Sequence, residues 1–509
     1  MQSHIKERTP MLGKRNPQEP LFYYFNMADM IPKNHILRLI NKYVDFSFIR
    51  SKVKHLYSDM GRPSIDPEVL IRMLLIGYLY GITSERKLCE EVRMHIGYRW
   101  FVGLHMNDEV PDHSTFSKNR HGRFKESGIF QEIFDEIVRQ CITHGLVSGK
   151  HLTVDGSLVK ANASLKSMEA VVVEMKPKEY IKRVEKENPV EEPWEPDDDF
   201  KHKKEKMSNK THRSKTDPDA RLARKGEGGA KLAHGVNYLM DNKHQIIIGV
   251  KAERPDRGGE TRAAVEMIKQ SKWKFKIKPQ TLGADKGYAT GEFVYHVFKE
   301  GVTPHIPIMN TRSKNDKGIF PITKFSFDAE RNEYICPQGK RLKYWGINKR
   351  SRQFVWRASV KDCKVCPLKG KCTRGRARSL SRHIYEDYLK HAREQTKTPF
   401  YRISQRMRKL IEGLFGEAKE YMGLRVAKFR RLWNVEEQFL LTATVQNIKK
   451  MAKLLHRGNK EAIQGVANLS NYAIKWFRFI IFQKQACLLQ AGLQIILCSC
   501  WPMNGSEKK

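Results

Sequence analysis

The chain has 509 residues, of which 40% are hydrophobic, so it is long enough for about three domains and too apolar for a disordered protein. It carries 94 Lys and Arg against 56 Asp and Glu, a formal net charge of +38. This excess predicts a polyanionic partner, because each phosphate contact releases counterions. Charge alone does not separate an enzyme acting on nucleic acid from a ribosomal or chromatin-packing protein.

The ends of the chain and its cysteines predict a cytoplasmic protein without a membrane partner. The first eight residues lack the apolar core of a signal peptide. The most apolar region, Trp476 to Trp501, is interrupted by Arg478, Lys484 and several glutamines, which makes it a poor membrane span. Nine cysteines, an odd number, fit a reducing compartment better than a disulfide framework.

Residues 15–145 are predicted to form a helical domain. Asp66 is expected to cap a helix that has Pro67 at its first position and runs to Gly81. Two more helices are expected, over Ser84–Val92 and Ser114–Phe124. Short basic helices of this kind suit a helix-turn-helix DNA-binding domain, and a plain helical bundle is the alternative.

Residues 150–310 are predicted to form an α/β layer with one antiparallel edge. His151–Asp155 and Thr281–Asp285 read as apolar strands that each end in an aspartate, where binding crevices of α/β sheets form. A polar insertion over residues 165–224 is expected to be an exposed helical or flexible segment. The remaining expected elements are strands at Asn237–Met240, Gln245–Val250 and Thr303–Met309, and helices at Arg262–Ser271 and Gly291–Glu300.

Residues 311–395 are predicted to form a β-rich, cysteine-bearing insertion. Its cysteines follow the spacing C-x26-C-x2-C-x5-C, with the members Cys336, Cys363, Cys366 and Cys372. Four thiolates can close a tetrahedral structural zinc site, and a Cys-x2-Cys pair is a common half of one. Reduced structural thiols and redox chemistry are the alternatives.

Residues 396–455 are predicted to form two helices, the first over about Arg402–Tyr421. A helix advances about 100° per residue, so Arg408, Glu412 and Lys419 lie within roughly 40° of one another on it. One carboxylate between two cations on a single face suggests a metal ion beside phosphate. Glu417 points about 140° away and is interpreted as a solvated residue.

Further basic residues after this helix are expected to follow the DNA backbone without reading sequence. They are Arg425, Lys428, Arg430 and Arg431. No role is predicted for the extension over residues 456–509.

The order of these motifs resembles bacterial insertion-sequence transposases of the DDE type, in a cysteine-bearing branch. The matching phrases are Thr153-Val154-Asp155-Gly156-Ser157, Gly283-Ala284-Asp285-Lys286-Gly287-Tyr288, Arg408-x3-Glu412-x6-Lys419, Thr216-Asp217-Pro218-Asp219-Ala220-Arg221 and Cys336-Pro337-Gln338-Gly339. The family signature has a tyrosine three residues before the arginine. Here that position is Gln405, and Tyr401 lies one turn earlier.

The resemblance implies a ribonuclease-H-like α/β catalytic core with an N-terminal all-α domain and the β-rich insertion before the glutamate helix. It implies that Asp155, Asp285 and Glu412 are catalytic and bind Mg²⁺ or Mn²⁺, with Asp155 bridging two ions. Arg408 and Lys419 would bind DNA phosphates.

The function implied is transposition by metal-dependent strand cleavage and strand transfer. The partners implied are double-stranded DNA, as element terminal repeats and target, and a second copy of the chain in a homodimer on the DNA ends. The location implied is a bacterial, nucleoid-associated one. A transposase-derived DNA-binding protein without catalysis and a stand-alone nuclease are the competing hypotheses.

Overall fold

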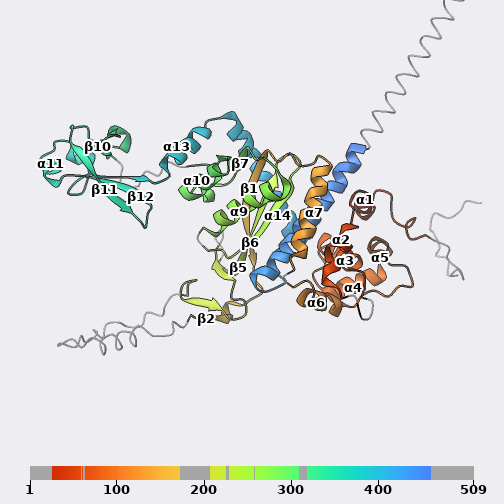
Figure 1. Cartoon of the computed structure of the whole chain (residues 1–509). Coiled ribbons are helices and arrows are strands. Elements are labelled where there is room, and N and C mark those ends of the chain that lie inside the picture. Colours follow the sequence, from red (N-terminus) through yellow and green to blue (C-terminus); the bar gives the residue numbers. More distant parts are fainter. Residues whose placement is uncertain are drawn as a thin grey trace, which may run out of the picture.

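The protein combines N-terminal helices, a central mixed sheet and a separate β-rich lobe (Figure 1). In the view of Figure 1 the N-terminal helices lie on one side of the mixed sheet and the β-rich lobe lies on the other. The computed structural model describes residues 26–58, 60, 64–125, 127–171, 207–224, 229–256, 258–308 and 318–459. The predicted extension beyond residue 459, with Cys487, Cys498 and Cys500, therefore falls outside the described residues.

The N-terminal helices form where the capping signals predict them. Asp66 accepts a hydrogen bond from the backbone N–H of Glu68 and has Pro67 after it, which confirms the predicted helix start. The arrangement of these helices as a helix-turn-helix stays a prediction. Their bounds are α1 Ile36–Tyr43, α2 Phe48–Val53, α3 Pro67–Leu79, α4 Glu85–Met94, α5 Ile96–Val102, α6 His113–His121 and α7 Ile129–Thr143.

The central sheet has the strand order β4-β5-β1-β7-β8, and β6 also pairs with β5. β1 is antiparallel to β5 and parallel to β7, and β7 is parallel to β8. The mixed α/β class predicted for this region is confirmed. The strands are β1 His151–Lys160, β4 Arg221–Ala223, β5 Lys231–Asp241, β6 Ile246–Glu253, β7 Thr281–Gly283 and β8 Thr303–His305.

Helices cover both faces of this sheet. Neighbouring residues of a strand point to opposite faces; on β1, Ser157 contacts α14, whereas Gly156 faces α9. Buried apolar residues of the N-terminal helices, the sheet and these helices form one continuous core. The helices are α9 Gly259–Phe275, α10 Gly291–Lys299, α14 Pro399–Tyr421 and a C-terminal helix over residues 432–459.

The cysteine-bearing insertion has a small core of its own. Tyr334, Leu342, Trp356, Cys372 and Leu380 are among its buried residues. The predicted β-rich character is confirmed, because its strands form one sheet in the order β13-β12-β11-β10-β9. The elements are β9 Ser326–Asp328, β10 Glu333–Ile335, β11 Arg341–Asn348, β12 Gln353–Ala358, α11 Val360–Lys364, α12 Lys369–Cys372, β13 Ser379–His383 and α13 Glu386–Gln395.

Two local predictions differ from the structure. The described flanks of the polar insertion hold short strands and one 3-10 turn, Leu165–Ser167, rather than an α-helix: β2 Met168–Ala170 pairs with β3 His212–Ser214, and β4 joins the main sheet. Residues 172–206 of that insertion lie outside the described part. The second difference is β1, which continues to Lys160 instead of ending at Asp155, because it pairs with β5 over its whole length.

None of the described helices is long and apolar enough to cross a membrane.

Candidate active site

Asp155 and Asp285 lie at matching positions of two neighbouring parallel strands. The pairing of β1 with β7 ends at Thr153 and Gly283, and each aspartate comes two residues later. The two aspartates therefore lie at the same level of the sheet, just beyond the carboxyl end of β7, where α/β sheets bind ligands. Asp155 is inside β1, which continues beside β5, whereas Asp285 follows the last residue of β7. Both residues are half-buried.

The helix α14 turns its predicted face toward β1. The Arg408 guanidinium lies between two acids, with Nη1 at 3.2 Å from Glu412 Oε1 and 4.0 Å from Asp155 Oδ2. Farther along the helix, Lys419 Nζ donates to Ser157 Oγ at 2.6 Å. The structure thus brings Asp155, Arg408 and Glu412 together, and Lys419 contacts the same strand two residues beyond Asp155.

Glu417 has a different environment from the one predicted. It is half-buried and binds the C-terminal helix through Lys449 Nζ at 2.5 Å and Gln446 Nε2 at 3.2 Å. The interpretation as a solvated residue is therefore wrong. Its direction away from Asp155 follows from the helical phase, as expected.

Gln405 connects α14 to the strand ends. Its Nε2 donates to the carbonyl oxygens of His305 at 2.6 Å and Ala284 at 3.2 Å. Ala284 directly precedes Asp285. The side chain that replaces the family's tyrosine therefore fixes the helix against the segment that carries the second aspartate.

The basic residues that follow α14 are not equivalent. Arg425, Arg430 and Arg431 are exposed. Lys428 instead lies over the ring of Tyr78 in α3, with Nζ 4.4 Å from the ring centroid, and burial lowers its pKa to about 8. Lys428 thus joins this loop to the N-terminal helices, which distinguishes it from the three exposed arginines of the predicted set.

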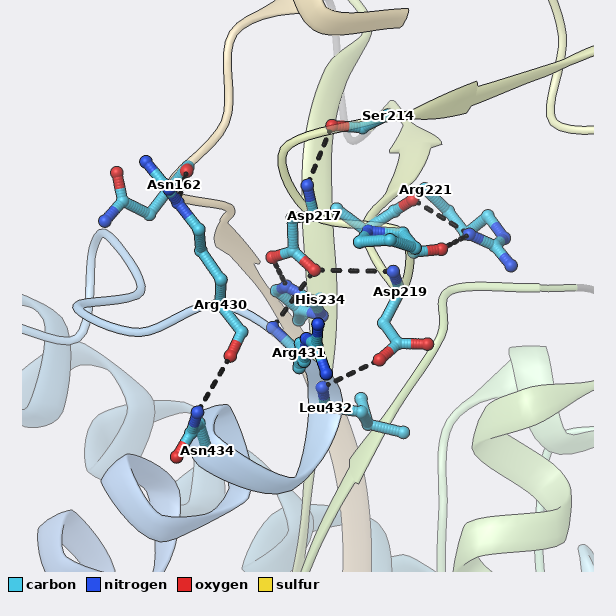
Figure 2. A network of polar contacts seen from close by, with 12 residues as sticks. Asn162, Ser214, Asp217, Asp219, Arg221, His234, Arg430, Arg431, Leu432 and Asn434 are labelled. Carbon is cyan, nitrogen blue, oxygen red and sulfur yellow. Dashed lines mark hydrogen bonds and ion pairs between the residues drawn. The ribbon is translucent and has the colours of Figure 1, made fainter. Parts of the chain in front are cut away.

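A buried carboxylate network holds this basic loop in place (Figure 2). Asp217 Oδ2 binds His234 Nε2 at 2.9 Å, and both side chains are fully buried. Asp217 Oδ1 accepts from the backbone N–H of Arg431, and Asp219 Oδ2 accepts from that of Leu432. Because the C-terminal helix begins at residue 432, these two aspartates cap it from another part of the chain.

The Asp217 carboxyl is held in its ionised form by this network. Burial alone would raise its pKa, but the hydrogen bonds from His234 and from the backbone N–H groups of Arg431 and Asp219 leave the pKa below its ordinary value. The Thr216–Arg221 motif is thereby explained by its contacts with the basic loop.

Two buried ionisable groups that interact with Glu260, one carboxyl and one phenol, were not singled out from the sequence. Burial raises the pKa of Glu253, at the end of β6, to about 7. Tyr288 follows Asp285 and is buried, and its pKa is raised by burial and by the charges of Glu260, Asp155 and Asp285. The sequence predicts a helix that begins at Arg262 and therefore excludes Glu260. In the structure α9 begins at Gly259, which places Glu260 in its first turn.

The four cysteines of the insertion lie near one another but are not arranged as metal ligands. Burial raises the pKa of Cys372, and the charges of Cys363, Cys336 and Cys366 raise it further, so the four thiols lie within electrostatic reach. All are free thiols. Among the described residues, no group of three or more His, Cys, Asp or Glu side chains is arranged to hold a metal ion, which applies to these thiols and to the three carboxylates.

Two parts of the chain match protein-family models. Residues 25–122 match a transposase domain (DUF772), and residues 335–452 match a transposase DDE domain. The second match contains Glu412 and the four cysteines, whereas Asp155 and Asp285 lie outside both.

A cryo-EM structure of a piggyBac transposase synaptic complex with hairpin DNA is 10% identical, with 84% of this chain and 75% of that chain covered at a TM-score of 0.32. A likeness at that TM-score is too weak to establish a shared fold. No curated protein matches the sequence.

Proposed function

We propose that this protein, an insertion-sequence transposase of the DDE type, cuts the ends of its element and joins the 3′ ends to target DNA in a metal-dependent reaction. The observation that carries the proposal is the meeting of Asp155, Arg408 and Glu412 on one face of the sheet, with Asp285 at the matching position of the next strand. The strand order of the mixed sheet, with Asp155 on its central strand, supports a ribonuclease-H-like core.

The acids fit a hard divalent cation by the chemistry of their donors. Mg²⁺ and Mn²⁺ prefer carboxylate oxygens, and the guanidinium between Asp155 and Glu412 marks a position where two acids already share one positive charge. Asp155, Asp285 and Glu412 would hold the metal. When bound, it would activate a water or 3′-hydroxyl for attack on phosphorus and stabilise the leaving oxygen.

The chain's own cations would bind and orient the DNA. Arg408 and Lys419 point to the sheet face beside Asp155, where a scissile phosphate would have to lie. Arg425, Arg430 and Arg431 extend the basic surface and would contact the backbone without reading bases. DNA ends held by a homodimer, and a cytoplasmic, nucleoid-associated location, belong to the same proposal.

Strand cleavage of element-end DNA in the presence of Mg²⁺ tests this function. Asp155→Ala, Asp285→Ala and Glu412→Ala are each expected to reduce cleavage by roughly 10²-fold or more, while DNA binding is kept. Glu330→Gln, which changes an exposed carboxylate in the turn between β9 and β10, is the control and should cleave like the parent. If the three alanine variants also cleave like the parent, the proposal is wrong.

The competing functions give different results in the same assays. A DNA-binding protein descended from a transposase would protect the ends in footprinting but cleave nothing with any metal. A stand-alone nuclease would cleave the ends without joining them to target DNA, so a strand-transfer assay separates it from the transposase.

Structural zinc at Cys336, Cys363, Cys366 and Cys372 stays a separate proposal that rests on their spacing. Their mutual approach and the small size of the core around Cys372 support it, because small cores commonly need a metal or cross-link. Metal analysis of the reduced, folded chain is expected to find about one zinc per chain. Its absence would leave the four residues as reduced thiols.

A further inference from the structure

A fourth carboxylate, that of Glu260, lies against the strand that carries Asp155. Glu260 is in the first turn of α9 and is exposed. A Cβ atom placed on Gly156 would lie 3.2 Å from Glu260 Oε1 and 2.7 Å from Asn237 Oδ1. The missing side chain at Gly156 therefore lets both oxygens approach β1 one residue after Asp155.

The edge of β1 is open at this position on the β7 side. Because the β1–β7 pairing ends at Thr153, the strand beyond it is no longer covered by β7. Asp155 Oδ1 accepts a hydrogen bond from the N–H of Gly156, so its carboxylate lies back along the strand toward Gly156. Glu260, on the α9 side, and Asp155, on the α14 side, therefore flank the same open edge of β1.

Several buried polar atoms beside these acids have no hydrogen-bond partner among the described residues, including both carboxylate oxygens of Glu253 and Nε of Arg408. Two of them are Tyr288 Oη and Asn237 Oδ1, on side chains that are 1% and 0% exposed. Asn237 Oδ1 approaches the same glycine as Glu260, and the charges of Glu260, Asp155 and Asp285 add to the effect of burial in raising the pKa of Tyr288. Buried polar groups without partners are rare in proteins and indicate an absent water or ligand.

We propose that Glu260 is a further ligand of the divalent metal at this edge, on the side of Asp155 opposite Arg408, and that Asn237 and Tyr288 bind water held by that ion. Hard cations keep several waters, which would supply the partners that the two buried groups lack. The proposal rests on the proposed function for the role of Asp155. It extends the predicted set of three acids by one that comes from the other face of the sheet.

A structural role for Glu260 makes a different prediction. An acid in the first turn of a helix stabilises it through the helix dipole, and that contribution does not depend on added metal. Metal binding therefore separates the two roles, whereas loss of activity alone would not.

Binding of Mn²⁺ to the full-length chain, measured by calorimetry and by the metal-induced rise in melting temperature, tests the inference. Glu260→Gln is expected to weaken Mn²⁺ binding by about tenfold or more and to reduce the rise. The matched control is Glu266→Gln, on the same helix, which loses a surface ion pair with Lys251, retains an acceptor oxygen for Gln270 Nε2, and should bind like the parent.

Asp155→Asn distinguishes failure of this inference from failure of the proposed function. If Asp155→Asn loses Mn²⁺ binding and Glu260→Gln keeps it, Glu260 is structural and the inference is overturned, while the function stands. If the parent binds no Mn²⁺, or Asp155→Asn binds it as the parent does, the metal site itself is wrong and both proposals fall.

Discussion

Arg408 holds together two acids that would otherwise repel each other. Its side chain is 18% exposed and Asp155 is 16% exposed, so their interaction is screened less than a surface pair would be. Glu412, at 59%, is the exposed partner. The arginine thus places one positive charge between the two acids.

Glu253 predicts a pH dependence of stability. Burial and the charge of Glu260 raise its pKa to about 7, against the lowering effects of Asn237 and Arg262. A folded-state pKa above the unfolded one means that the folded chain holds the proton more tightly. The stability that the folded chain gains by holding this proton on Glu253 is therefore complete below about pH 4.5. It is lost as the pH rises through about 7.

The neutral variant Glu253→Gln should remove this dependence. We expect it to be more stable than the parent at pH 8, by on the order of 3 kcal/mol, and to lose that advantage toward pH 5. Urea unfolding across this range measures the difference, with Glu266→Gln as an exposed control. Parallel pH profiles for the parent and Glu253→Gln would contradict the assignment.

At the scale of elements, α14 is positioned by contacts at both ends and its centre. Thr398 caps its first turn, Gln405 binds the ends of β7 and β8, and Lys419 reaches Ser157 on β1. Tyr238 of β5 stacks on Phe415, with ring centroids 4.5 Å apart. These contacts fix the rotation of the helix, and hence which face meets Asp155.

The capping of the C-terminal helix by Asp217 gives a prediction at the same scale. Asp217→Ala removes a buried acceptor from His234 and from the N–H of Arg431, so it should cost roughly 3 kcal/mol or more. Asp217→Asn keeps an acceptor oxygen and should cost less. Urea unfolding, with hydrogen exchange of residues 432–435, measures both effects.

The result would tell whether the basic loop depends on this network. We expect faster exchange at residues 432–435 in Asp217→Ala, together with weaker DNA binding, because Arg430 and Arg431 lie directly before the capped turn. Unchanged exchange in a folded Asp217→Ala variant would show that the helix start does not need the aspartate.

At the scale of the whole molecule, the positive charge is spread unevenly. Residues 318–383 of the insertion hold 17 Lys and Arg against four Asp and Glu. This lobe contacts the main sheet's helices through the stacked rings of Tyr295 and Tyr385, 4.3 Å apart, and the ion pair of Arg352 with Glu292 at 2.5 Å. A strongly basic lobe beside the main sheet makes the local electrostatic potential more positive, which favours the approach of a polyanion.

Salt dependence of DNA binding tests the contribution of the basic loop. Replacing Arg425, Arg430 and Arg431 with alanine should reduce the slope of log K against log salt by roughly one for each phosphate that these arginines bind. The decrease should be the same for specific and random DNA, because backbone contacts carry no sequence information. A change confined to element-end DNA would instead assign these arginines to base recognition.

Local sequence patterns predict some residues of the candidate site and miss others. Asp155, Asp285 and the Arg408–Glu412–Lys419 face could be chosen from the sequence, because strand ends and helical phase are local and periodic. The position of Glu260 beside β1 and the packing of Lys428 on Tyr78 could not be predicted in this way. Both depend on which elements lie next to each other, and no local pattern records that.

The sequence by itself determined the helical start at Asp66, the mixed α/β layer, the β-rich insertion and the direction of the side chains of Arg408, Glu412 and Lys419 on α14. Each follows from hydrogen-bond capping and from the periods of helix and strand, which act within a few residues. The tertiary structure alone decided that β1 runs past Asp155, that Asp217 and Asp219 cap a helix more than 200 residues away, and that β1 loses its pairing with β7 just before Asp155. Those outcomes depend on long-range pairing, because a strand's length and a carboxylate's partner are set by the neighbour that buries them.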